Sequence, residues 1–236
     1  ARKTEGGRKM IYEIAGLKVE MEPRFGRLMK QCEGYRSSGT PVMTLMPDPR
    51  DEAQVQVPTQ EEREYILHSA AFCREIIQHG RFFLHASGVV CGGEAFLFSG
   101  PSGTGKSTHT ALWQKLYPGI QILNDDKPVI WPEKGHITAW GTPFSGRTDL
   151  QRNLGVPLMG ICFLKQAREN RIRPVAETEA LALILNNTWR PKDDKTMNLL
   201  LNGIQQVVEE IPIFELSCTT DPEAALLSYA TMKGMR

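Results

Sequence analysis

Residues 96–114 read FLFSGPSGTGKSTHTALWQ, and this stretch decides the fold. The pattern G-x-x-x-x-G-K-[S/T] is met by Gly100, Gly105, Lys106 and Ser107. An apolar run precedes the pattern and a helix-like segment follows it, which is the context that a phosphate-binding loop requires. Glycines let successive backbone N–H groups converge on a phosphate, and the start of a helix adds unpaired N–H donors. The sequence therefore predicts an α/β fold built around a phosphate-binding loop.

The side chains of this loop indicate a nucleotide and a metal ion. Lys106 would carry the positive charge that faces the terminal phosphates, and Ser107 would offer its hydroxyl to Mg²⁺. A glycine-rich turn that merely joins a strand to a helix is the alternative. We expect ATP, or another nucleoside triphosphate, to contact eight residues of the loop: Gly100, Ser102, Gly103, Thr104, Gly105, Lys106, Ser107 and Thr108.

The composition is that of an ordinary globular protein. The chain has 236 residues, of which 41% are hydrophobic and 23% charged, enough for one large α/β domain with a small appendage. The net charge of +1 gives no reason to expect nucleic acid or an anionic membrane as a partner. No apolar run approaches the roughly 20 residues that cross a bilayer, and the N-terminus lacks a secretion signal. We therefore expect a cytoplasmic location.

The cysteines favour reduced thiols. The chain has five of them, an odd number, and they are scattered without a C-x-x-C pair. Neither a zinc site nor a disulfide framework is supported by such spacing.

Changes of pattern along the chain suggest three parts. The polar opening, residues 1–9, is expected to be flexible. Residues 10–58 are expected to form a small N-terminal α/β segment, beginning with a strand or hairpin that turns at Gly16. This segment ends in PDPRDEAQVQVPTQ, whose three prolines are expected to break regular structure. Residues 59–236 are expected to form the phosphate-loop domain, starting with a helix from Thr59 to about Gly80.

The remaining pattern predicts a mixed sheet flanked by helices. A hairpin turning at Gly92 and Gly93 leads into the phosphate loop, so the sheet cannot be wholly parallel. Further strands are expected over residues 120–131, 136–144, 156–166 and 212–218, and helices over residues 179–189, 193–211 and 221–234.

A pair of acids follows the loop at a distance that suits phosphate chemistry. In ILNDDKPVI an apolar strand delivers Asp125 and Asp126 at its end. Because neighbouring strand residues point to opposite faces, the two carboxylates can serve different tasks. One can bind the metal while the other accepts the proton of a phosphoryl acceptor. An acidic turn without a catalytic role is the alternative.

The order of three motifs resembles the catalytic core of the HPr kinase/phosphorylase and phosphoenolpyruvate carboxykinase superfamily. The motifs are HASGVV, GPSGTGKST and LNDDKPVI, and the similarity covers about residues 80–130. The resemblance implies that Asp126 joins Ser107 at the metal, that Asp125 is the general base, and that His85 lies near the transferring phosphoryl group. A hydrogen-bonded core histidine is the alternative for His85.

Basic residues for the transition state are sought in the loop GTPFSGRTDLQRN, residues 141–153. Arg147, and less strongly Arg152, could offer planar charged donors to a phosphate oxygen. Either could equally be a solvated surface arginine. His109, on the helix after the phosphate loop, is expected to be structural.

Three functions remain open from the sequence. The first is a Mg²⁺-dependent kinase that moves the γ-phosphoryl of ATP to a hydroxyl, most simply a serine of a peptide or small protein. The second is a kinase of a small metabolite, and the third a nucleotide-responsive binding module without catalysis. The protein-recognition signature of HPr kinases and the oxaloacetate site of carboxykinases have no visible counterpart, so the resemblance does not supply the acceptor. An open groove or sheet edge in residues 10–58 would favour a peptide, and a lid would favour a metabolite. A homo-oligomer is suggested by the resemblance alone.

Overall fold

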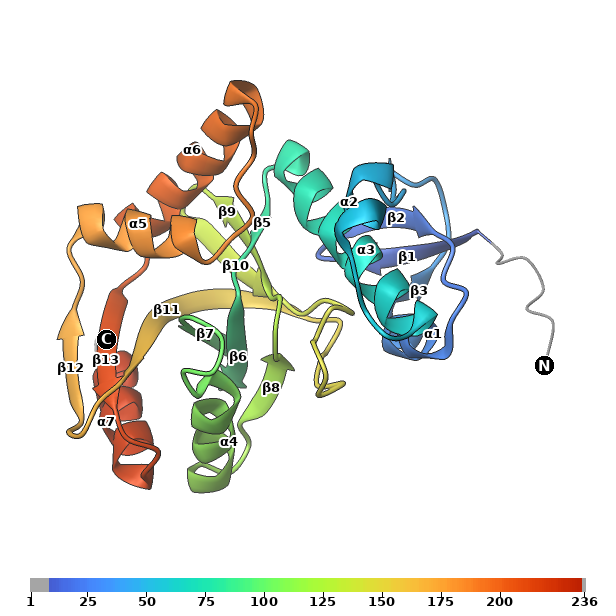
Figure 1. Cartoon of the computed structure of the whole chain (residues 1–236). Coiled ribbons are helices and arrows are strands. Elements are labelled where there is room, and N and C mark those ends of the chain that lie inside the picture. Colours follow the sequence, from blue (N-terminus) through green and yellow to red (C-terminus); the bar gives the residue numbers. More distant parts are fainter. Residues whose placement is uncertain (1–8, 235–236) are drawn as a thin grey trace.

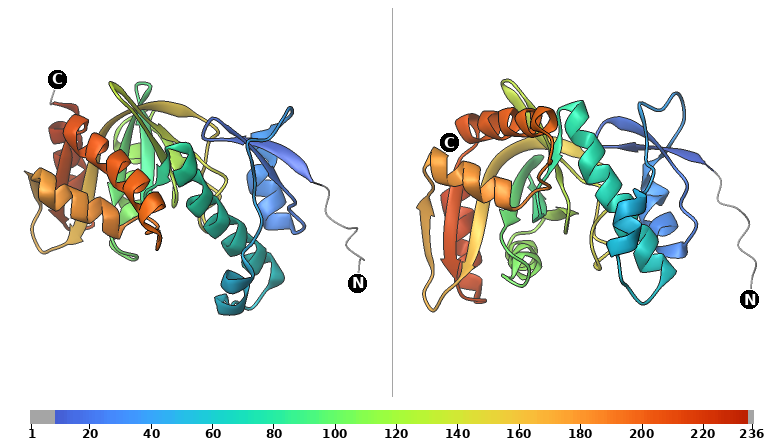
Figure 2. Two further views of the ribbon diagram at one scale, coloured as in Figure 1. Left: turned by 90° about the horizontal axis from the view of Figure 1, so that it is seen from above. Right: turned by 45° about the horizontal axis from the view of Figure 1, so that its top comes forward.

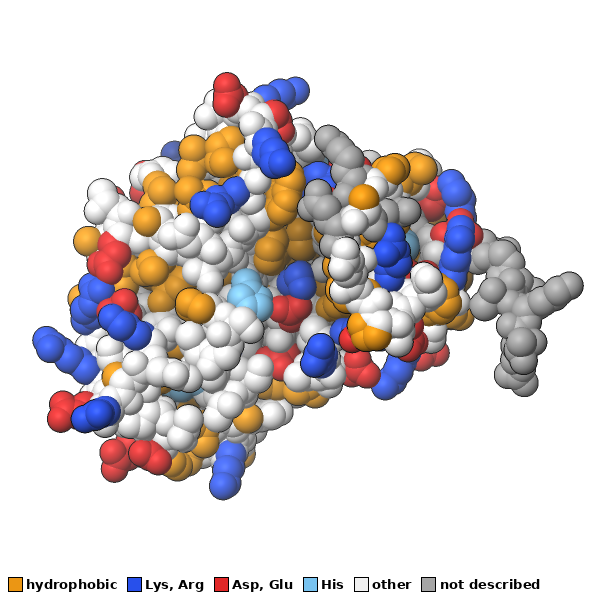
Figure 3. Space-filling model, viewed as in Figure 1, with side chains coloured by type: hydrophobic (Ala, Val, Ile, Leu, Met, Phe, Trp, Pro, Cys, Tyr) orange, Lys and Arg blue, Asp and Glu red, His pale blue; other side chains and the backbone are white. Residues whose placement is uncertain are grey.

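Two sheets, each with its own helices, make up the molecule (Figure 1). The computed structural model describes residues 9–234, without the side chains of residues 50, 52 and 54. The end expected to be flexible therefore lies, apart from residue 9, outside the described residues. No helix of the described part is long and apolar enough to cross a membrane. On the face shown in Figure 3, acidic and basic side chains are interspersed, and both kinds lie beside a histidine near the middle of that face.

The smaller sheet has four strands in the order β3-β1-β2-β4. Their bounds are β1 Met10–Ile14, β2 Leu17–Met21, β3 Arg36–Ser37 and β4 Met43–Thr44. The first two strands form a hairpin whose turn contains Ala15 and Gly16, both with positive φ, as predicted. Helix α1, Gly26–Cys32, and the 3₁₀ helix Glu33–Tyr35 connect β2 to β3. We call residues 10–44 the N-terminal unit.

Two helices follow the N-terminal unit. Helix α2, Pro49–Gln54, lies in the proline-containing stretch that was expected to be irregular, and that expectation was wrong. A proline at the start of a helix loses no intrahelical hydrogen bond, so Pro49 begins the helix instead of breaking it. Helix α3, Gln60–Glu75, begins as predicted at Thr59, whose hydroxyl accepts a hydrogen bond of 3.1 Å from the backbone N–H of Glu62. The 3₁₀ helix Ile76–His79 continues α3 to Gly80.

Helix α3 shares its core with the N-terminal unit. Tyr65 and Phe72 of α3, with Ile76 of the 3₁₀ helix that follows, pack in one buried cluster with apolar side chains of β1, β2 and α1. Phe144, from the 141–153 loop, completes that cluster. The N-terminal unit is therefore joined to the rest of the chain by a continuous apolar core.

The larger sheet has nine strands. They are β5 Phe82–Phe83, β6 Ala86–Cys91, β7 Glu94–Ser99, β8 Gln121–Asn124, β9 Val129–Glu133, β10 His136–Trp140, β11 Gly155–Gln166, β12 Arg171–Pro174 and β13 Ile213–Cys218. Their order is β5-β9-β10-β11-β7-β6-β8, with β13 also paired to β11 and β12 to β13. Among these strands, β12 was not predicted from the sequence, and β5 and β6 were expected as one strand of the hairpin.

Both strand directions occur in this sheet. Strand β11 is parallel to β7 and to β13, whereas β6 is antiparallel to both β7 and β8. The carboxyl ends of β7, β8, β11 and β13 therefore meet at one edge, and the start of β6 lies at the same edge. This mixed pairing confirms the predicted fold class.

Helices cover both faces of the larger sheet (Figure 2). Helices α4, Lys106–Leu116, and α7, Pro222–Lys233, cover one face, while α5, Glu177–Asn186, and α6, Asp194–Glu210, cover the other. Strand β7 alternates between the two cores, because Phe96 and Phe98 pack toward α4 and α7 while Ala95 and Leu97 pack toward α5 and α6.

Replacing Gly141 by alanine should destabilise the protein. A β-carbon there would overlap the carbonyl oxygen of Arg152 and lie 2.6 Å from that of Leu123, and backbone atoms cannot swing aside. We expect a loss of about 1–3 kcal/mol in the free energy of unfolding, measured by urea titration. Gly34→Ala is the control, because nothing lies within 4 Å of a β-carbon at Gly34. Equal stability of the two variants would contradict the close approach at Gly141.

Candidate functional site

The glycine loop, residues 100–107, joins β7 to α4. Its backbone needs glycine, since Gly100, Gly103 and Gly105 have φ values of +142°, +82° and +95°. At Gly100 a β-carbon would also lie 2.9 Å from the carbonyl oxygen of Leu164 on the neighbouring strand β11. These three glycines therefore have the conformational role that the motif predicts for them.

Lys106 curls back over the loop. Its ammonium donates hydrogen bonds to the carbonyl oxygens of Gly100, at 2.8 Å, and Pro101, at 3.0 Å. Burial lowers the pKa of Lys106, and the carboxylates of Asp126 and Asp125 partly oppose that shift. The lysine of the loop and the acid pair are therefore close enough to interact electrostatically.

The hydroxyl side chains of the loop differ in exposure. Ser102, Ser107 and Thr108 are exposed, and the latter two lie in the first turn of α4. Thr104 is half-buried, and its hydroxyl donates to the carbonyl oxygen of Pro101 at 2.9 Å. Ser107 is thus accessible to a ligand at the start of α4, where the helix presents unpaired N–H groups.

Asn124 shapes the turn that carries the acid pair. Its side-chain oxygen accepts hydrogen bonds from the backbone N–H groups of Asp126, at 3.0 Å, and Lys127, at 2.7 Å. Its amide nitrogen donates to the carbonyl oxygen of Thr142 at 2.7 Å. Because Asn124 is fully buried, these bonds fix the chain direction just after β8. This role of Asn124 was not predicted, although an asparagine directly before two aspartates at a strand end is typical of such a turn.

Asp126 forms an ion-pair cluster with His85 and Lys127. His85 Nδ1 lies 3.0 Å from one carboxylate oxygen, and the Lys127 ammonium bonds the other. Burial alone would raise the pKa of Asp126, but the bonds and charges of His85 and Lys127 hold it below its usual range. For Lys127, burial works to lower the pKa, and the Asp126 charge raises it above the usual value. Asp126 therefore stays ionised, and Lys127 is a charged member of the site that sequence reasoning missed.

Within residues 9–234, the carboxylate of Asp125 lacks the kind of partners that Asp126 has. Both of its carboxylate oxygens are buried, and neither has a hydrogen-bond partner among the described residues. Its backbone N–H donates to the carbonyl oxygen of Leu150 at 3.1 Å, which ties the turn to the 141–153 loop. Buried side-chain oxygens without hydrogen-bond partners are costly to folding, so Asp125 is a candidate functional residue.

The 141–153 loop lies against the acid pair and is held by α1 and α3. A β-carbon on Gly146 would lie 3.2 Å from that of Asp126. The backbone N–H of Gly146 donates to the hydroxyl of Tyr65 at 2.8 Å, and its carbonyl accepts from Arg27. Gln31 donates to a carboxylate oxygen of Asp149 at 2.7 Å. The N-terminal unit and α3 thus fix the loop that borders the acid pair.

Arg147 and Arg152, the two arginines of this loop, contact parts of the chain other than the acid pair. The side chain of Arg147 is 90% exposed and lies 4.0 Å from Glu62. Arg152 pairs through its backbone N–H with the carbonyl oxygen of Leu123 at 2.9 Å. The structure thus brings together His85, Lys106, Asp125 and Asp126, and directs the side chain of Arg147 toward α3.

The residues present suit Mg²⁺ bound together with a phosphate. Within residues 9–234 no group of three or more His, Cys, Asp and Glu side chains has the arrangement of a metal cage. Mg²⁺ is usually held by one or two carboxylates, substrate phosphates and water, without a dedicated protein cage. Asp126, ionised, and Asp125, with both oxygens unpaired, supply carboxylates of that kind, and Ser107 offers an exposed hydroxyl in the first turn of α4.

A comparison with protein families shows to which family this chain belongs. The family described as "SynChlorMet cassette protein ScmC" matches residues 57–222, well over half of the chain. The chain belongs to this family. It is a different family from the HPr kinases that the three motifs resemble, so the resemblance holds only as a weak likeness of fold.

The HPr(Ser) kinase/phosphatase from Coxiella burnetii is among the solved structures that match. It is 14% identical, the match covers 64% of this chain and 88% of that chain, and the TM-score is 0.37. A likeness at this level says nothing about activity or substrate. No curated protein matches the chain.

His109 is buried, in agreement with the structural role expected for it. Its Nε2 lies 2.9 Å from the hydroxyl of Ser228 on α7, and burial lowers its pKa to about 4. The imidazole is therefore neutral at pH 7, one turn after the glycine loop.

The neutral state of His109 predicts how stability depends on pH. In the unfolded chain a histidine takes up a proton near pH 6.5, whereas in the folded chain it does so near pH 4. The unfolded state thus binds more protons between these values, and stability must fall as the pH falls through this window. We expect the loss to be on the order of 3 kcal/mol.

The free energy of unfolding of His109→Gln, measured by urea titration, should change less between pH 7 and pH 4.5 than that of the unchanged protein. His136→Gln is the control, because His136 is exposed. Parallel pH curves for all three proteins would contradict the burial of a neutral His109.

Proposed function

We propose that the chain is a Mg²⁺-dependent phosphotransferase that moves the terminal phosphoryl group of ATP, or of another nucleoside triphosphate, to a hydroxyl group. One observation carries the proposal. Lys106 of the glycine loop lies within electrostatic reach of Asp125 and Asp126, at the common edge where β7 and β8 end. A phosphate-binding cation beside two carboxylates of unlike surroundings is what phosphoryl transfer requires.

The glycine loop would hold the phosphates. Backbone N–H groups of the loop and of the first turn of α4 would face the phosphate oxygens. Lys106 would exchange its two carbonyl partners for the terminal phosphates. Ser107 and Asp126 would hold Mg²⁺, which neutralises charge on the transferring group when it is bound. The pairing of His85 with Asp126 would keep that ring beside the phosphoryl group.

Asp125 would act as the general base. Its carboxylate would take the proton of the acceptor hydroxyl while the hydroxyl oxygen bonds to the terminal phosphorus, and the nucleoside diphosphate would leave with the electrons of the broken P–O bond. Because both carboxylate oxygens are covered, a neighbouring segment must move before the acceptor reaches them. Arg147 would have to leave Glu62 to contact a phosphate oxygen.

A peptide or small protein is the acceptor that the N-terminal unit favours. A groove of about 490 Å³ lies between α3 and strands β2 and β4, and its lining includes Met21, Leu45 and Leu67. Strand β4 is the last strand of its sheet, and Val42 and Met46 beside it are exposed. An edge strand next to a groove lined by both apolar and charged side chains suits a peptide in extended conformation.

A nucleotide-responsive binding module without catalysis is the second candidate. The observation that favours it is the burial of both oxygens of Asp125, since a base must reach its substrate. Both candidate functions predict nucleotide binding, but only the phosphotransferase predicts transfer of a phosphoryl group.

Replacement of Asp125 by asparagine separates the two. With γ-labelled ATP, Mg²⁺ and fractionated lysate of the source cells, we expect transfer to fall at least about a hundredfold, the scale of a lost general base. Nucleotide affinity, measured by calorimetry, should change little. Lys106→Ala should weaken binding itself. Asp194→Asn and Lys195→Ala, both at exposed positions of α6, are the matched controls.

The destination of the label decides the acceptor class. Label on a peptide or protein fraction supports the peptide acceptor, and label on a small molecule would replace it by a metabolite. Undiminished transfer by Asp125→Asn would remove Asp125 from the mechanism. Nucleotide binding without transfer by the unchanged protein would establish the binding module.

A further inference from the structure

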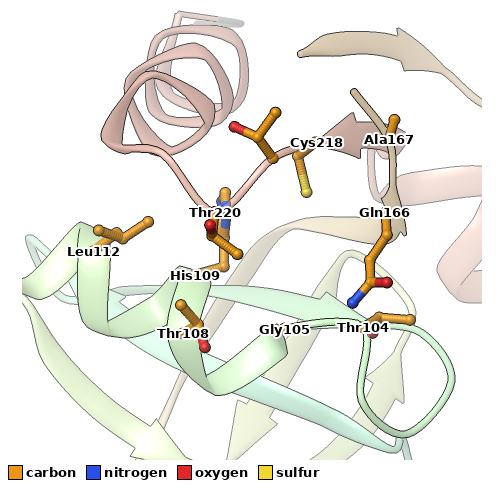
Figure 4. Close-up of a pocket in the computed structure, with 10 residues that line it drawn as sticks. Thr104, Gly105, Thr108, His109, Leu112, Gln166, Ala167, Cys218 and Thr220 are labelled. Atoms are coloured by element: carbon orange, nitrogen blue, oxygen red, sulfur yellow. The ribbon is translucent and has the colours of Figure 1, made fainter. Parts of the chain in front are cut away.

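A pocket of about 320 Å³ adjoins the glycine loop (Figure 4). It lies between the first turns of α4 and the chain segments that follow β11 and β13. Thr108 and Leu112 line it from α4, Gln166 and Ala167 from the end of β11, and Cys218 and Thr220 from the end of β13. Its volume is in the range of pockets that hold small organic ligands.

The sheet explains the place of this pocket. Strands β7, β11 and β13 are neighbours and parallel, so their carboxyl ends open on the same crevice. In α/β sheets, ligands bind in the crevice outside the carboxyl ends of the strands. The glycine loop follows β7, and the pocket follows the next two strands. A ligand on the loop therefore has direct access to the pocket.

The pocket and the loop differ in charge. None of the side chains that line the pocket, all of them within the described residues, is an acid, a lysine or an arginine. His109, which also lines it, is neutral at pH 7 because burial lowers its pKa to about 4. Lys106, by contrast, lies in the adjoining loop. A ligand that spans both would be anionic at one end and an uncharged polar molecule at the other.

The walls of the pocket are already in place. The side-chain amide of Gln166 donates to the carbonyl oxygen of Gly103 at 2.9 Å, which ties the end of β11 to the glycine loop. The sulfur of Cys218 points into the hollow, and Thr220 lies between it and α4 (Figure 4). A preformed pocket loses little conformational entropy when it binds its ligand.

The acid pair lies on the other side of the loop. Asp125 and Asp126 follow β8, which is separated from β7 by β6, whereas the pocket lies on the β11 side of β7. A phosphoryl acceptor that meets Asp125 therefore approaches from the side opposite to the pocket. The pocket is left for the part of the donor that does not react.

We propose that this pocket binds the nucleoside, base and ribose, of the nucleotide whose phosphates lie on the glycine loop. The nucleotide then runs from β13 across β7 toward β8, with its terminal phosphate facing His85 and the acid pair. The hydroxyls of Thr108 and Thr220 supply uncharged hydrogen-bonding groups in the pocket, and Leu112 an apolar contact. This inference rests on the proposed function, which supplies the phosphate site.

Filling the pocket tests the proposal. Ala167 and Thr220 are exposed at its rim, so Ala167→Trp and Thr220→Trp should fold. Calorimetry would compare ATP and GTP, each with Mg²⁺, with inorganic tripolyphosphate, which has the phosphates without the nucleoside. We expect both variants to bind the nucleotide at least about tenfold more weakly. Their affinity for tripolyphosphate should be unchanged. Ala53→Trp, at an exposed position of α2, is the matched control.

The outcomes distinguish this proposal from the proposed function. Nucleotide affinity unchanged in both pocket variants overturns the nucleoside pocket and leaves the phosphate site intact. Tripolyphosphate affinity equal to nucleotide affinity in the unchanged protein also overturns the pocket, because the nucleoside would then add nothing. Lys106→Ala with unchanged affinity for tripolyphosphate overturns the phosphate site instead. Weaker nucleotide binding in the two pocket variants, but not in the Ala53→Trp control, supports the assignment of the pocket to the nucleoside.

Discussion

The parallel pairing of β11 with β7 and β13 is the constraint on which the rest of the structure depends. Parallel strands place their carboxyl ends together and need helical connections that cover the faces of the sheet. The same pairing presses Gly100 against the backbone of Leu164, so that only glycine can begin the loop there. One pairing pattern thus determines the helical layers and the shape of the loop, and it opens the crevice beside it.

The two acids show how one turn makes unlike carboxylates. Asn124 holds both residues in a fixed backbone, but the side chain of Asp126 contacts His85 and Lys127, and that of Asp125 has no hydrogen-bond partner among the described residues. Burial works against the ionised form of Asp126, and the hydrogen bonds and charges of His85 and Lys127 outweigh it. A difference of this kind lets neighbouring carboxyl groups divide a reaction between ion binding and proton transfer.

Local signals predicted most of the fold. The Thr59 cap, the Gly92-Gly93 turn and the glycine loop each act through backbone preferences of a few residues, and the structure has each where it was expected. Helix α2 was missed because a proline was interpreted as a breaker, although it is tolerated in the first turn of a helix. Strand β12 was missed because its four residues form a strand only by pairing with β13, which is distant in the sequence.

The candidate site was predictable only in part, because some of its contacts also join residues that are distant in the sequence. The loop and the acid pair are contiguous motifs, but the ion pair of Lys127 with Asp126 depends on burial that many segments create together. The exposed side chain of Arg147 lies 4.0 Å from Glu62, which belongs to α3 and is distant in the sequence. The pocket beside the loop consists of residues from three separate elements, each unremarkable in the sequence.

The hydrogen bonds of α1 and α3 to the 141–153 loop give the two sheets a physical route for thermodynamic coupling. Gly146 lies against Asp126, and its backbone is hydrogen-bonded by Tyr65 and Arg27. A ligand that binds the N-terminal unit and shifts this loop must therefore change the free energy of the turn that carries the acids. Linkage is reciprocal, so occupancy at the acid pair changes the affinity of the N-terminal unit by the same factor. Under the proposed function, acceptor binding at one sheet and phosphoryl transfer at the other would therefore depend on one equilibrium.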